Sequence, residues 1–170
     1  MQLVRRDATV RVLACTPSNA AADLLVERLS GASFDPDQLY RLNAYSREEE
    51  VPEDVRTFSV VPRQAKLLEV RVVLSTCASA GMLQTWNVPV GQFGHIVIDE
   101  AAQADEPLVM IPIMTFSNAH TNVILAGDPN QLSPVIKSPT AAKAGLEKSY
   151  LRRLILIREI FGLDTQVGKT

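Results

Sequence analysis

The sequence predicts an α/β fold, in which a parallel sheet is flanked by helices. Short apolar runs, each about one strand long, alternate along the chain with stretches of helical periodicity. The most apolar runs end directly in polar clusters, as expected at the ligand-binding edge of a parallel sheet. With 170 residues, 46% of them hydrophobic and 21% charged, the composition is that of one soluble globular domain.

The N-terminal part predicts one strand and one helix. We expect a strand at Val10–Thr16, which Pro17 ends, and Ser18 or Asn19 can cap the helix that follows, Ala20–Leu29. Helical spacing places four apolar side chains near one face of this helix: Ala20, Leu24, Leu25 and Leu29.

The middle of the chain predicts a less regular region. Leu39–Leu42 is a short apolar run within a polar connector, and prolines punctuate residues 44–63, which we expect to be a partly irregular excursion. The charge run Arg47–Glu50 is most often a solvated surface in other proteins. Residues 63–69 have a helical pattern.

The C-terminal part predicts three more strands and further helices. The strands are expected at 71–76, 95–98 and 122–126, and residues 77–83 form a short helix or turn. A helix begins near Glu106, and Pro112 should kink or shorten it. The tail, 138–161, is mostly helical in pattern.

Several classes of protein are disfavoured by composition. The net charge is −2, so any contact with nucleic acid has to be local. No apolar run could span a bilayer, and the N-terminus has no signal peptide. We therefore expect a cytoplasmic protein, of which a part could also reside in the nucleus. Cys15 and Cys77 lie in apolar runs without paired spacing, so we expect buried free thiols.

The stretch Gly94–Gln103 carries the strongest chemical signal. Three β-branched apolar residues run into two adjacent carboxylates, Asp99 and Glu100, which should stand at the rim of the sheet. Carboxylates at this place are hard oxygen ligands for Mg²⁺, which bridges to substrate phosphates. The competing interpretation is that Asp99 merely caps the next helix.

Three other strand ends carry polar clusters. These are Thr16–Asn19, Gly127–Gln131 and, more weakly, Ser75–Thr76. Because parallel strands place their carboxyl ends on one edge, the clusters can converge with Asp99 and Glu100. This convergence favours a ligand site over a helix cap.

At these positions the sequence resembles superfamily 1 helicases. Residues 12–19 resemble motif Ia, 73–77 motif Ic, 99–103 motif II (the Walker B box) and 125–135 motif III. The set resembles the Upf-like branch and, within it, the Armitage-type RNA-silencing helicases; residues 39–44 and 138–151 support the narrower match. The resemblance covers nearly the whole chain and implies an incomplete RecA-like P-loop NTPase domain.

The resemblance implies ATP and Mg²⁺ as cofactors. Asp99 would hold Mg²⁺ through water, Glu100 would orient or deprotonate the attacking water, and Gln131 would sense the γ-phosphate. Gln103 would either support these residues from behind or couple the nucleotide site to the rest of the domain. Asp128 is grouped with the nucleotide-binding residues. We favour a structural role for it, in a turn that links the nucleotide site to the nucleic-acid site, over direct contact with a ligand.

The resemblance also implies contact with the sugar–phosphate backbone of a single strand. Hydroxyl, amide and backbone N–H groups fit phosphate contacts that carry no sequence information. Ser18 and Asn19 can cap a helix instead, and both roles are compatible because a helix N-terminus is itself a phosphate site. The expected contacts are Thr16, Pro17, Ser18, Asn19 and Thr76.

One motif of the family is missing. The Walker A loop, G-x-x-x-x-G-K-[ST], should precede Val10, where too few residues stand. The terminal Gly168-Lys169-Thr170 is a chance match, because no strand precedes it and no helix can follow. We expect an internal fragment of a helicase or a truncated gene model, inactive alone, with an unpaired sheet edge at Asn122–Ala126.

The expected function is therefore part of an ATP-dependent, 5′ to 3′ RNA helicase acting in RNA silencing. Its partners would be single-stranded RNA, the remaining helicase chain with its second RecA-like domain, and silencing-complex proteins. Two alternatives stay open: a DNA helicase of the same superfamily, and a degenerate RecA-like module that binds nucleic acid or protein without turnover.

Overall fold

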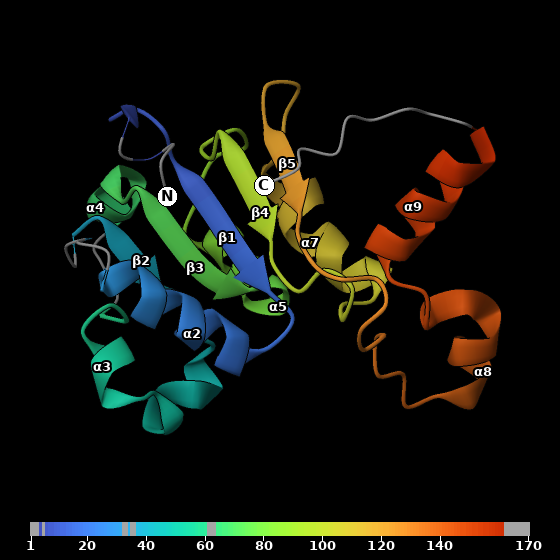
Figure 1. Ribbon diagram of the computed structural model, residues 1–170. Coiled ribbons are helices and arrows are strands. Elements are labelled where there is room, and N and C mark those ends of the chain that lie inside the picture. The colour runs from blue at the N-terminus through green and yellow to red at the C-terminus, as the bar shows by residue number, and fades with distance from the viewer. Residues whose placement is uncertain (1–3, 5, 32–33, 35–36, 61–63, 162–170) are drawn as a thin grey trace.

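The chain forms a five-stranded, all-parallel sheet with helices on both faces (Figure 1). The computed structural model describes residues 4, 6–31, 34, 37–60 and 64–161. The strand order is β2-β3-β1-β4-β5, and the strands are β1 (Val12–Thr16), β2 (Leu39–Arg41), β3 (Val72–Thr76), β4 (His95–Ile98) and β5 (Asn122–Leu125). The predicted fold class is confirmed.

Alternation along the central strands divides the core into two layers. Leu13 of β1 and Val73 of β3 face the layer that α7 (Glu106–Phe116) covers, whereas Val72 and Leu74 face the layer under α2 (Asn19–Ser30). Because both faces are covered, a run of apolar residues without polar alternation is the pattern that suits such strands. All five residues of β3 are buried.

The helices begin where local signals predict. In α2 (Asn19–Ser30), the Ser18 side chain accepts a hydrogen bond from Ala21 N, so Ser18 is the cap and Asn19 is the first helical residue. Helix α7 (Glu106–Phe116) continues four residues past Pro112, so the expected shortening does not occur there. Short helices α5 (Cys77–Ala80) and α6 (Met82–Thr85) follow β3, and α4 (Gln64–Glu69) precedes it.

The middle of the chain holds regular structure that its sequence pattern did not predict. Leu39–Arg41 is a strand, β2, which pairs with β3 at one end of the sheet. The excursion at 44–63 contains two short helices among its described residues, η1 (Tyr45–Glu50) and α3 (Glu53–Arg56).

The buried face of α2 also differs from the helical pattern. Ala22, Asp23 and Val26 are buried, while Leu24 is 43% exposed. The face turned inward therefore includes a carboxylate, because two arginines from outside the helix neutralise it.

The C-terminal segment is helical with an interruption. Helices α8 (Pro139–Ala141), η2 (Ala142–Leu146) and α9 (Tyr150–Phe161) follow the loop after β5, and Gly145 breaks the helical path at φ 104°. Arg153 of α9 donates two hydrogen bonds to Glu106 of α7, Nε to Oε2 at 2.7 Å and Nη2 to Oε1 at 2.5 Å. This fork attaches α9 to the helix that follows β4.

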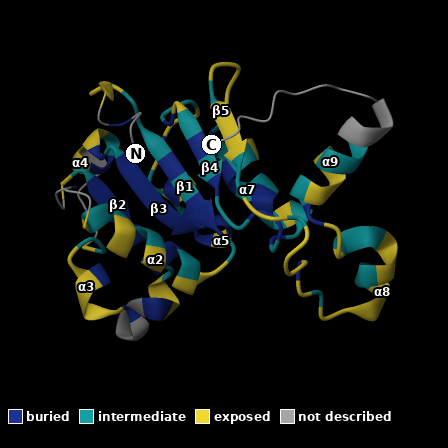
Figure 2. Ribbon diagram, viewed as in Figure 1, coloured by how far each residue is buried: buried dark blue, intermediate teal, exposed yellow. Residues whose placement is uncertain are grey.

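Strand β5 lies at the edge of the sheet, as predicted. Val123 and Ile124 are 40% and 41% exposed, and Figure 2 shows this strand as the least covered of the five. Cys15 and Cys77 are buried free thiols, also as predicted, and burial raises the pKa of Cys15. Among the described helices, none has the length and apolar character to cross a membrane.

Candidate nucleotide and nucleic-acid site

The polar clusters come together at the carboxyl ends of four strands. Thr16 is in register with Thr76, Cys15 with Ile98, and Ile98 with Leu125, so the loops that follow β1, β3, β4 and β5 leave the sheet at one edge (Figure 1). The predicted convergence of the motifs is therefore present.

Asp99 and Glu100 stand immediately after β4. Asp99 N donates to Cys15 O at 2.8 Å, which fixes the start of the turn, and Asp99 Oδ1 accepts the N–H of Glu100 at 3.0 Å. The cap of α7 is Asp105, whose side chain accepts from Leu108 N at 2.9 Å. Asp99 is therefore not the helix cap, and the competing interpretation is excluded.

Glu100 is held in an unusual backbone conformation. Its φ is +55°, in the left-handed region that a residue with a Cβ adopts at a cost. Gln103 Nε2 donates to Glu100 Oε2 at 2.8 Å, and Gln103 N donates to Glu100 O at 2.9 Å. One carboxylate oxygen is thus anchored from behind, while Oε1 accepts from no described residue.

Motifs II and III touch through their main chains. Ala101 N donates to Ala126 O at 2.8 Å, and Gly127 follows with φ +152°. A Cβ at Gly127 would lie 3.0 Å from Ala101 N, closer than ordinary packing allows. Only glycine lets the two loops approach this far.

Asp128 organises the loop that carries Gln131. Its Oδ1 accepts Asn130 N at 2.9 Å, its Oδ2 accepts Gln131 Nε2 at 3.2 Å, and its carbonyl accepts Gln131 N at 3.1 Å. This is an Asx turn, which matches the turn that we favoured for Asp128. Both side chains are exposed.

The loop after β1 uses its side chains in different ways. Thr16 is fully buried, and its hydroxyl donates to Ser18 O at 2.7 Å. Ser18 caps α2, and Pro17 lies between them, half-buried. Asn19 is exposed at the surface and accepts from Arg41. Thr16 therefore shapes the loop from beneath, while Pro17, Ser18 and Asn19 form its outer surface.

Thr76 has a similar internal role. Its Oγ1 accepts Ser79 N at 3.1 Å and is 3.0 Å from Ser79 Oγ, so it caps α5 beneath the surface. Contact of these residues with a nucleic acid stays a prediction, and for Thr16 and Thr76 the present conformation offers only an indirect role.

A buried ionic cluster beneath this loop was not predicted. Arg41 of β2 is 0% exposed, and Asp23 of α2 is 5% exposed. Arg41 Nε donates to Asp23 Oδ1 at 3.0 Å, and Arg47 donates to both carboxylate oxygens, at 3.0 and 2.5 Å. The solvated surface expected for the 47–50 charge run is therefore wrong for Arg47, which is buried with a partner.

The cluster perturbs the acidity of its members. Burial raises the pKa of Asp23, but the hydrogen bond from Arg47 and the charge of Arg41 outweigh it and leave the pKa below its ordinary value. Burial lowers the pKa of Arg41, and Asp23 opposes that change. A cationic residue inside an otherwise apolar run was the one sequence signal that could have disclosed this cluster.

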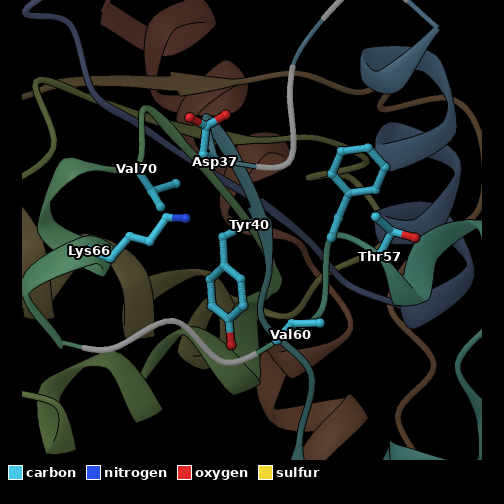
Figure 3. Close-up of a pocket in the computed structure, with 7 residues that line it drawn as sticks. Asp37, Tyr40, Thr57, Val60, Lys66 and Val70 are labelled. Atoms are coloured by element: carbon cyan, nitrogen blue, oxygen red, sulfur yellow. The ribbon is translucent and has the colours of Figure 1, made fainter.

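A polar cavity of about 550 Å³ opens beside the motif III loop. Its walls are Ala102, the segment that includes Gln131, residues Lys148 and Ser149 just before α9, and Arg152 of α9. A second cavity of about 580 Å³, shown in Figure 3, lies elsewhere, against Tyr40 of β2 and Lys66 of α4. None of the predicted site residues lines the second cavity.

The donor set suits a hard divalent cation. Asp99 offers a carboxylate oxygen, Oδ2, that accepts from no described residue, at the edge where the strands end. Among the described residues, no three His, Cys, Asp or Glu side chains are grouped as for a metal ion. Mg²⁺ binding by Asp99 through water stays a prediction.

The fold and the strand-end motifs are those of a RecA-like helicase domain. The AAA-domain family matches residues 38–139. The chain belongs to this family and, within it, to the Upf-like superfamily 1 helicases of the Mov10 and Armitage type.

Three relatives illustrate the match. The chain is 41% identical to the RNA helicase Mov10l1 of Homo sapiens, 38% to mov-10-B.1 of Danio rerio and 32% to armi of Drosophila melanogaster, covering 85%, 94% and 91% of this chain. The alignments span only 12%, 17% and 15% of these relatives' own length. Among solved structures, the helicase MrfA bound to DNA and AMPPNP gives a TM-score of 0.43 at 17% identity, covering 87% of this chain and 21% of that one.

Proposed function

We propose that this chain is part of an ATP-dependent RNA helicase that couples ATP hydrolysis to movement along single-stranded RNA. The observation that carries the proposal is the direct contact of motifs II and III, in which Ala101 N donates to Ala126 O at 2.8 Å. This contact lies at the edge of the sheet where the loop after β1 also begins. Asp99 N also donates to Cys15 O at 2.8 Å, so a change at the nucleotide residues could reach the nucleic-acid residues after β1 through the end of this strand.

The nucleotide half of the proposal assigns one role to each residue. Asp99 would hold Mg²⁺ through water, and the bound cation would neutralise charge on the β- and γ-phosphates. Glu100 would orient the attacking water or accept its proton through Oε1, because Gln103 already engages Oε2. Gln131, on the turn built by Asp128, would donate its amide to the γ-phosphate.

The nucleic-acid half uses the exposed residues after β1. Pro17, Ser18 and Asn19 lie at the N-terminus of α2, where backbone N–H groups and the helix dipole favour a phosphate. Thr16 and Thr76 would support this surface from beneath. We favour RNA over DNA because Mov10l1, a relative, carries RNA helicase in its name.

The finer parts of the proposal follow the Armitage-type resemblance. They are movement from 5′ to 3′, a role in RNA silencing, a cytoplasmic location with an open nuclear pool, and partnership with a second RecA-like domain and silencing-complex proteins. Cell fractionation tests the location of the tagged full-length helicase that contains this chain. Sequencing of the RNA that co-purifies with it tests the substrate.

Calorimetric titration with a non-hydrolysable ATP analogue tests the nucleotide site. We expect binding that requires Mg²⁺. Asp99→Asn should weaken it at least about tenfold, because the residue that would hold the cation against the two phosphates loses its charge. Asp54→Asn, at an exposed carboxylate of α3, is the matched control and should bind normally. Binding that is indifferent to Mg²⁺ and to Asp99→Asn would refute the assignment.

A further inference from the structure

The side chain of Asn19 is held by an arginine from another element. Asn19 is the first residue of α2, and its Oδ1 accepts a hydrogen bond from Nη2 of Arg41, in β2, at 3.1 Å. Twenty-two residues separate the two in sequence, so this contact exists only because the edge strand β2 packs beside α2.

The chemistry of the guanidinium fixes which way the carboxamide faces. An arginine side chain has only donors, so the Asn19 atom opposite Nη2 has to be the oxygen. The NH₂ group of Asn19 therefore faces away from Arg41, and within the described part of the chain it donates to no acceptor. Because Asn19 is exposed, the structure presents a directed donor at the surface of the helix N-terminus.

Arg41 itself cannot turn away. Its three nitrogens are all engaged: Nη2 with Asn19, Nε with Asp23 Oδ1 at 3.0 Å, and Nη1 with Leu42 O at 2.5 Å. The Arg41 side chain is 0% exposed, and Arg47 donates to both carboxylate oxygens of Asp23, which holds this partner in place. A planar fork with three fixed contacts transmits its orientation to Asn19.

We propose that Arg41 is a positioning residue for nucleic-acid binding, which orients Asn19 so that its NH₂ donates to a phosphodiester oxygen of a single strand. This inference rests on the proposed function and adds a buried residue to it. A phosphodiester oxygen is acceptor-only, so the donor end of the carboxamide is the end that it needs.

Asn19→Asp separates this role from a structural one. The new carboxylate keeps the acceptor for Arg41 and is favourable in the first turn of a helix, so folding should be preserved or improved. It removes the outward donor and places a negative charge at the phosphate. We expect affinity for fluorescein-labelled oligouridine, measured by anisotropy, to fall at least about tenfold.

Asn118→Asp is the matched control. It adds the same charge to another exposed asparagine, in the turn before β5 at the opposite end of the sheet, where its Oδ1 also accepts a hydrogen bond, from His120 N. Oligouridine affinity should change by less than about twofold, because salt screens a charge at the far end of the sheet from the proposed oligouridine site.

Arg41→Lys tests the positioning step directly. Lysine keeps the charge but cannot span three acceptors, so Asn19 should lose its orientation. In ¹⁵N spectra, oligouridine should shift the Asn19 side-chain NH₂ signals of the wild-type chain and leave them unshifted in Arg41→Lys. Arg56→Lys, at a half-exposed arginine of α3 that pairs with Glu53, is the control and should retain the shift.

The outcomes separate the two proposals. If the wild-type chain binds oligouridine and Asn19→Asp binds equally well, the inference about Arg41 and Asn19 is wrong while the proposed function stands. If the folded wild-type chain binds no oligouridine, the nucleic-acid half of the proposed function fails and the inference fails with it. Should Arg41→Lys not fold, the Asn19→Asp result decides alone.

Discussion

Strands β3 and β5 have nearly the same apolar sequence and very different surroundings. Val72–Leu74 of β3 is wholly buried, whereas Val123 and Ile124 of β5 are about two-fifths exposed. The motif residues differ in the same way: Thr76, at the end of β3, is buried, and Gln131, in the loop after β5, is exposed. The comparison shows that neighbours on each side, rather than a strand's own residues, decide how deeply the strand and its motif are buried.

Removal of Asp23 should cause the largest loss of unfolding free energy. Asp23→Ala leaves Arg41 and Arg47 without their shared carboxylate, and breaking a buried pair in this way costs about 3–5 kcal/mol of unfolding free energy. Urea denaturation measures the loss. Glu53→Ala, in an exposed pair with Arg56, is the control and should cost less than about 1 kcal/mol. Equal effects would mean that the buried cluster does not stiffen this side.

A matched pair of valines compares the two strands directly. Val73→Ala, at a fully buried position of β3, should cost about 2 kcal/mol through lost burial and the cavity left behind. Val123→Ala in β5 should cost less than about 1 kcal/mol. Thermal or urea unfolding of both variants gives the values. Similar losses would show that β5 is covered in solution.

The dependence of unfolding free energy on pH, at acidic pH, should reveal the ion pairs of Asp23 with Arg41 and Arg47. The folded pKa of Asp23 is lowered, so its stabilisation is fully present above the unfolded pKa of about 3.9 and is lost as the pH falls through the folded pKa. Unfolding free energy should therefore decline more steeply below about pH 4 in the wild-type chain than in Asp23→Asn. Parallel curves would contradict the assignment.

Amide exchange should give the smallest and most local difference. Asn122 N and Ala126 N donate toward β4, so by strand alternation the N–H groups of Val123 and Leu125 point away from it. These two amides should exchange faster than that of Ile124, whereas β1, paired on both sides, should show no such alternation. Uniform protection across 122–126 would contradict the free edge.

Four strands and their meeting edge could be predicted because each is an apolar run that ends in a motif. Strand β2 could not, because it has three residues and one is Arg41, whose charge is acceptable only beside Asp23. The same ion pair accounts for the burial of Arg47, which was expected in a solvated charge run, and for Asp23 rather than Leu24 facing inward on α2. The errors share one cause: a long-range ion pair reverses which residues of a local pattern face inward.

Within the candidate site, the sequence indicated which residues carry suitable chemical groups but not how they are arranged. Asp99, Glu100 and Gln131 could be named from the sequence, but nothing in it showed that Asp105 caps α7 or that Thr16 is buried. The contact between Ala101 and Ala126 involves only backbone atoms, which side-chain patterns do not encode; Gly127, permitted by its missing Cβ, was its only trace.

The left-handed backbone at Glu100 has a consequence for anyone who evolves or engineers this domain. A glycine there would relieve the conformational cost, so selection for thermal tolerance alone would favour losing the carboxylate. Libraries screened only for folding should therefore accumulate glycine at position 100, at the expense of the carboxylate that the proposed function needs.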